Sequence, residues 1–97
     1  MTAPRRIRFE QRVLGVTTAE TWHFVDEMPE SVELPMPGER SGPTHSKAAW
    51  RRVIAIEKAP AAWEVVAVVK LEPIDCSRLQ RDFNAEVAAL VAAGWER

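Results

Sequence analysis

The chain has 97 residues, of which 46% are hydrophobic and 28% are charged, and its formal net charge is −1. This length predicts one domain, residues 1–97, with a single two-layer core, and the ordinary composition excludes wholesale disorder. The near-neutral charge argues against a protein whose main task is to coat nucleic acid or an anionic membrane.

Cysteine content and the N-terminal residues favour a reducing, intracellular setting. The single cysteine, Cys76, cannot form an intrachain disulfide, and no histidine or cysteine has metal-binding spacing. Met-Thr-Ala-Pro-Arg-Arg is followed by no apolar run, so no signal peptide is expected. The longest uncharged apolar stretch, 87–95, is far shorter than the ~20 residues that span a bilayer. We expect a cytoplasmic protein without cofactor, metal or membrane partner.

Two strands are predicted at the beginning of the chain, at 5–16 and 21–27. In the first, Ile7, Phe9 and Val13 fall on one face, and the other face is mostly arginine. The short connection around 17–20 predicts a β-hairpin. In the return strand, Trp22 points inward.

A second hairpin is predicted from strands at 49–58 and 62–72, joined by a short turn that contains Pro60. One face of the last strand is wholly apolar. The opposite face keeps Val66 and Val68 between charged ends, and Val53 and Ala55 extend this apolar centre. Loop 28–47 or a second subunit is expected to cover that face, because an exposed apolar patch is a liability.

Segment 28–47 interrupts the strand pattern with several prolines and glycines. Such long loops are usually functional or disordered. From Glu20 to Glu39, both included, the chain has six acidic residues and no lysine or arginine, with apolar residues spaced among them. Two interpretations remain open: a mobile solvated loop, or a segment that docks into a basic groove on another protein. The protein-binding residues predicted by the second interpretation are Glu27, Glu30, Glu33, Leu34, Met36, Glu39 and Trp50.

A helix is predicted over residues 75–93. Asp75 or Ser77 provides the N-cap, and Gly94 fits a left-handed C-terminal position from which Trp95 folds back on Leu90. Apolar side chains form one stripe, and the opposite face is alanine. Alanine tolerates exposure as a good helix former, but small residues also let a second helix approach closely. The second interpretation predicts a homodimer whose interface residues are Val66, Val68, Ala85, Ala88 and Ala92.

Together these elements predict an α+β fold: a four-stranded antiparallel sheet of two β-hairpins, with one C-terminal helix packed on one face. Trp22, Trp63 and Trp95 are expected in the core, and Trp50 is expected to be the exposed tryptophan.

Function is predicted from what the chain lacks and from its acidic loop. His23, His45 and Cys76 form no recognisable catalytic pattern, so we expect a non-enzymatic adaptor, inhibitor or accessory subunit that binds a larger protein. The alternative is a nucleic-acid-binding protein that uses an arginine-lined sheet face. The residues predicted for that face are Arg6, Arg8, Arg12, Arg51 and Arg52.

Overall fold

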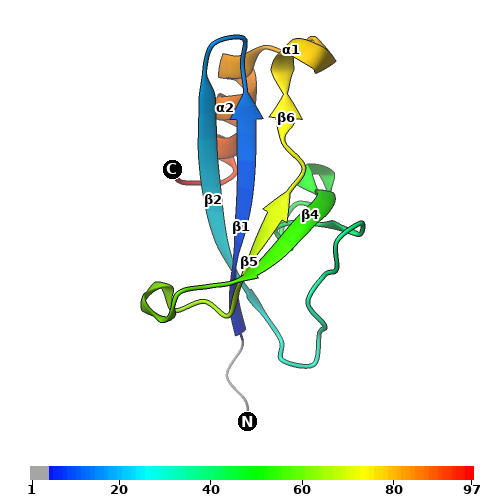
Figure 1. Cartoon of the computed structure of the whole chain (residues 1–97), viewed down its shortest axis with the longest axis vertical. Helices are drawn as coiled ribbons and strands as arrows, with labels where there is room; N and C mark the ends of the chain where they lie inside the picture. The colour runs from blue at the N-terminus through cyan, green and yellow to red at the C-terminus, as the bar shows by residue number, and fades with distance from the viewer. Residues whose placement is uncertain (1–4) are drawn as a thin grey trace.

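The computed structural model describes residues 5–97 and shows a curled mixed β-sheet with a helix packed against it (Figure 1). The predicted α+β class is therefore confirmed. Residues 1–4, on which the expectation of no signal peptide partly rests, lie outside the described residues.

Within residues 5–97, six strands form the sheet, in the order β2-β1-β5-β4-β3, with β6 also paired to β1. β1 and β2 form the predicted first hairpin, and β4 pairs antiparallel with β5. The bounds are β1 Arg5–Leu14, β2 Ala19–Met28, β3 Arg40–Ser41, β4 Arg51–Lys58, β5 Ala67–Leu71 and β6 Ile74–Asp75.

The prediction of a wholly antiparallel sheet is wrong, because β1 runs parallel to β5 and to β6. Ile7 lies opposite Ala67, and Phe9 lies opposite Val69. Segment 29–50 carries the chain from the end of β2 back along the molecule to the start of β4 (Figure 1). Only a long connection of this kind lets the two hairpins join through parallel strands.

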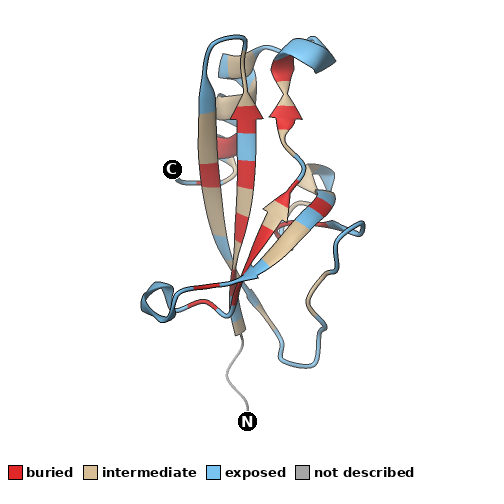
Figure 2. Ribbon diagram, viewed as in Figure 1, coloured by how far each residue is buried: buried red, intermediate tan, exposed pale blue. Residues whose placement is uncertain are grey.

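The main core lies between the inner face of the sheet and the C-terminal segment (Figure 2). Alternate residues of β1, including Ile7, Phe9 and Val13, are buried there together with Trp22 and Leu90. Val53 also faces this core, although we expected it on the outer face with Ala55. A β-bulge at Ile54 separates the two residues and shifts the alternation of β4.

Val68, at the apolar centre of the outer face, is covered by the connection between β4 and β5 and not by loop 28–47, whereas Val66 stays 46% exposed. This connection contains a short 3₁₀ helix, η2 (Ala61–Trp63), so β5 begins at Ala67 and the strand predicted over 62–72 is too long. Ala59 and Val65 pack with Val68, which is only 4% exposed.

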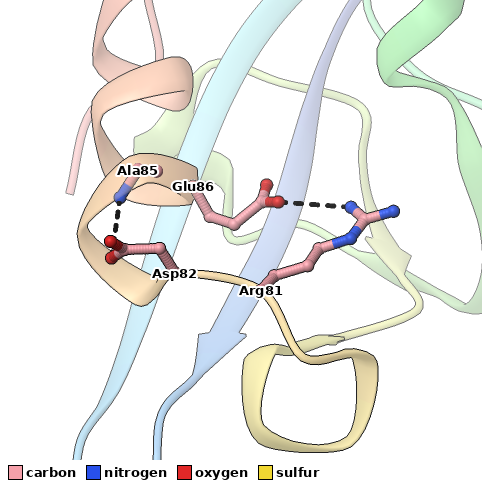
Figure 3. Close-up of polar contacts among 4 residues, drawn as sticks. All are labelled: Arg81, Asp82, Ala85 and Glu86. Atoms are coloured by element: carbon pink, nitrogen blue, oxygen red, sulfur yellow. Dashed lines mark hydrogen bonds and ion pairs between the residues drawn. The ribbon is translucent and has the colours of Figure 1, made fainter.

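The single helix predicted over 75–93 is wrong, because this stretch contains two α-helices, α1 (Cys76–Leu79) and α2 (Phe83–Ala92). Gln80 adopts a left-handed conformation with φ 54° that ends α1. The Asp75 side chain accepts a hydrogen bond from the backbone N–H of Arg78 as the predicted N-cap. Asp82 then caps α2 by accepting from the N–H of Asn84 and from that of Ala85. Figure 3 shows the bond from Ala85.

The predicted end of the second helix is confirmed. Gly94 has φ 93°, and its N–H donates to the carbonyl of Val91 at 3.1 Å. The N–H of Trp95 donates to the carbonyl of Leu90 at 2.9 Å, which completes a Schellman motif. Neither helix within residues 5–97 has the length and apolar character needed to cross a membrane.

Candidate functional site

The segment between β2 and β3 has a defined conformation made of two turns. The carbonyl of Pro29 accepts from the N–H of Val32, and that of Met36 accepts from Glu39, both at 3.0 Å. Gly38 has φ 96° after Pro37, the arrangement that a type II turn requires. The N–H of Gly38 donates to the carbonyl of Val53 at 2.8 Å, and the N–H of Val53 donates to the carbonyl of Glu39 at 2.7 Å. These bonds join the segment to β4.

This segment forms one side of a groove of about 440 Å³, here called the loop groove. Its lining includes predicted protein-binding residues that come from both ends of the long connection: Glu33, Leu34, Met36, Glu39 and Trp50. The other two predicted residues, Glu27 and Glu30, are exposed but lie outside the lining.

The loop groove combines an apolar surface with carboxylates. Leu34 is half-buried and packs against the main core, so it forms a fixed base. Met36 is 65% exposed and lies in the turn, so its apolar side chain is available for contact. The Glu39 carboxylate accepts from the N–H of Met36 at 3.0 Å, which fixes that acid beside the turn, and Glu33 is exposed.

Trp50 forms a wall of the loop groove and is half-buried, so the prediction that it is the exposed tryptophan is wrong. Its Nε1–H donates to the carbonyl of Pro43 at 2.8 Å, and its ring lies directly against Gly42. A Cβ at Gly42 would lie 2.7 Å from this ring, so only glycine fits there. Trp63, expected in the core, is 43% exposed because it lies in η2 and not in a strand.

The arginines predicted for nucleic-acid binding do not form one surface. On the outer face, Arg6 pairs with Glu64 at 3.8 Å, and the Arg8 guanidinium stacks over the Trp63 ring at 4.3 Å. These contacts occupy part of that positive charge. The remaining three are Arg12 and Arg52, both exposed, and Arg51, which lines a cleft beside α2.

The residues predicted for a dimer interface divide into two groups. Ala85, Ala88 and Ala92 are exposed on α2, and Val66 is 46% exposed. Val68 is buried by the chain's own residues, as described above, and cannot contribute to a subunit contact in this conformation.

The two histidines and the cysteine do not form a catalytic arrangement with one another. Cys76 is 3% exposed, and burial together with the Glu86 carboxylate raises the pKa of its thiol, which disfavours the thiolate. Burial, together with the charge of Arg8, lowers the pKa of His23. His45 instead packs against the Phe24 ring, with 5.0 Å between ring centroids. Within residues 5–97, no three His, Cys, Asp or Glu side chains form a group able to hold a metal ion.

A second cleft, which sequence reasoning missed, lies beside α2 and is here called the α2 cleft. Its volume is about 340 Å³. Arg81 and Glu86 pair at its edge, with 3.2 Å between guanidinium and carboxylate (Figure 3). One sequence signal was present: Gln11 interrupts the apolar alternation of β1 at an inward position, and it is almost fully buried.

Comparison of the chain with protein-family models, with curated proteins and with solved structures finds no match.

Proposed function

We propose that this protein is a non-enzymatic interaction module that acts by occupying a surface on a larger protein through the loop groove. The observation that carries the proposal is the convergence of Leu34, Met36 and Trp50 with two carboxylates in one groove. Aromatic residues and methionine are enriched in protein interfaces, and the bonds to β4 hold the groove in shape before binding.

The partner that fits this surface is an extended basic segment of another protein. Glu33 and Glu39 line the groove together with Arg40, so the lining carries two carboxylates and one guanidinium. Glu27 and Glu30 are exposed nearby in the chain. A group of carboxylates attracts a basic partner and accelerates its association. The exposed Met36 side chain offers an apolar contact for a partner side chain placed between the basic residues.

We further propose that the protein acts as a homodimer through the alanine face of α2. Ala85, Ala88 and Ala92 are exposed together, and no charged residue lies between Val87 and Trp95. A second copy of the same uncharged face is the simplest complement to it, and the small side chains permit close approach across a two-fold axis.

The binding proposal is tested by affinity capture from the cells that make the protein, using wild type, Met36→Lys and Val16→Lys as baits. Val16 is 87% exposed in the turn between β1 and β2, so it provides the same chemical change at a site away from the groove. A partner recovered by wild type and by Val16→Lys is expected to bind Met36→Lys at least about tenfold more weakly, the scale of a hot-spot residue.

Equal recovery with all three baits would contradict the loop groove as the contact, and so would a partner that lacks basic segments. Point variants are preferable to a deletion of the loop, because Gly38 and Glu39 hydrogen-bond to β4 and their removal would disturb the sheet.

A further inference from the structure

The α2 cleft has the size and the lining of a small-ligand site. It lies between α2, β6 and a short 3₁₀ helix, η1 (Lys47–Ala49), and its volume of about 340 Å³ falls at the lower end of the range for ligand pockets. The apolar part of the lining is Ala48, Ala49, Ile74, Ala89, Leu90 and Ala93. The polar groups come from separate parts of the chain, and they include Trp95, Arg51 and Gln11.

The first is the indole of Trp95. This residue is only 4% exposed, and its Nε1 atom is buried without a hydrogen-bond partner among residues 5–97. By contrast, the indole N–H of Trp22 donates to Glu20 at 3.1 Å, and that of Trp50 donates to Pro43. A buried donor left unpaired costs about 1–3 kcal/mol, a penalty that the other two indoles do not carry. Because Trp95 lines the cleft, its indole N–H is placed to report on a ligand bound there.

The second is Arg51, which forms no ion pair with residues 5–97, whereas Arg81 is paired with Glu86. Burial lowers the pKa of Arg51 and the charge of Arg81 acts in the same direction, whereas the carboxylates of Glu86 and Glu72 oppose them. A partly desolvated guanidinium without an ion-pair partner is stabilised by an anion.

The third is Gln11, which is 2% exposed on the inner face of β1. Its Nε2 group donates to the carbonyl of Arg12 at 3.1 Å and to that of Glu72 at 2.7 Å. These bonds use both amide donors, so Gln11 offers no further donor to a ligand carboxylate, and the contact with an anion depends on Arg51.

We propose that the α2 cleft binds a small organic monoanion, a carboxylate on a compact apolar body. The carboxylate pairs with Arg51, and the apolar body lies against the alanine-rich wall. A doubly charged phosphate fits less well, because Glu86 already neutralises Arg81 and would repel a second negative charge. This site shares no lining residue with the loop groove and does not depend on the function proposed for it.

The four tryptophans allow a direct test by NMR, because each indole N–H gives its own signal and Trp95→Phe identifies the one from Trp95. Phenylacetate and hexanoate are titrated, with phenylacetamide as the uncharged match and acetate as the match without an apolar body. At least one of the two carboxylates, phenylacetate or hexanoate, is expected to shift the Trp95 signal saturably. Phenylacetamide and acetate are expected to bind at least about tenfold more weakly.

Arg51→Gln is expected to weaken binding about tenfold or more, the scale of a charge-assisted hydrogen bond. Arg52→Gln is the matched control, because Arg52 is exposed and does not line the α2 cleft. If Arg51→Gln fails to fold, Ala89→Leu, which fills the cleft from α2, is expected to abolish the shift. Absence of a saturable Trp95 shift with both carboxylates would overturn the proposal, as would equal binding of phenylacetamide or an equal loss in Arg52→Gln.

Discussion

His23 lies on the outer face of β2, opposite Glu10, with the guanidinium of Arg8 near enough to influence it. Burial and then the charge of Arg8 lower its pKa, and Glu10 opposes them only in part. The folded protein therefore binds a proton at His23 less readily than the unfolded chain does. Above the unfolded pKa of about 6.5, both states are neutral at this position and His23 makes no pH-dependent contribution.

As pH falls below that value, His23 is protonated in the unfolded chain before it is protonated in the folded protein. The free energy of unfolding therefore decreases until the lower, folded pKa is reached. We predict that wild type loses more stability than His23→Gln between about pH 7 and about pH 5. Urea unfolding of both proteins at the two pH values measures the difference, and the carboxylates common to both cancel. A difference in unfolding free energy that stays constant with pH would contradict the account.

Single residues were predictable where the alternation of a strand decides their side. Trp22 is buried and the arginines of β1 are turned away from the core, as the pattern of 5–16 and 21–27 indicates. Trp50 and Trp63 were not predictable in this way. Trp63 lies in η2, where strand alternation no longer applies, and Trp50 is held by a hydrogen bond to Pro43 that no local pattern reveals.

Among the elements, α2 depends on Asp82 for its start. The Asp82 carboxylate accepts from the N–H of Asn84 at 2.9 Å and from that of Ala85 at 3.3 Å. Without this cap, two backbone donors would lose their partner, so Asp82→Ala is expected to lower the free energy of unfolding by about 1 kcal/mol. Denaturant unfolding measures it, with Asn84→Ala as an exposed control in the first turn. A loss no larger than in the control would show that Asp82 is not the cap.

Asp82 also marks the break between α1 and α2, which the sequence prediction joined into one helix. The apolar stripe continues from Leu79 to Phe83 at helical spacing, and the sequence has no glycine or proline between them. Gln80 nevertheless turns into the left-handed region, and the N–H of Arg81 donates to the carbonyl of Cys76 at 2.9 Å. Asp82 was the available signal, since aspartate favours N-cap positions over helix interiors.

The parallel pairing of β1 with β5 was also hidden from local patterns. Strand alternation shows which face of a strand is buried, but it does not say which strand lies beside it. The length of segment 29–50 was the one clue, because a connection of that length permits a return along the molecule.

For the whole molecule, the alanine face of α2 predicts self-association. Wild type is expected to have the mass of a dimer by light scattering, and Ala88→Glu the mass of a monomer, because the substitution would place a charge in the contact. Ala62→Glu, at an exposed position in η2, is the matched control and is expected to remain dimeric. A monomeric wild type, or a dimer that survives Ala88→Glu, would contradict this part of the proposal.

The two candidate sites differ in how far the sequence could reveal them. The loop groove draws most of its lining from consecutive residues, so the mixture of acidic and apolar residues in 28–47 indicated it directly. The α2 cleft draws its lining from β1, η1, β4, β6 and α2, and only the folded sheet brings these segments together. Arg51 was accordingly assigned to an outer arginine surface, although it lies beside α2.

The central claim is that the acidic loop is a preformed surface held against β4, and amide hydrogen exchange tests it most directly. The N–H groups of Gly38 and Val53 donate to Val53 and Glu39, respectively, so both amides are expected to exchange slowly, as amides in the core strands do. The amides of Val16 and Thr17, in the exposed turn between β1 and β2, provide the fast reference. Exchange of Gly38 and Val53 as fast as in that turn would contradict the claim, because no loop groove would then exist before a partner binds.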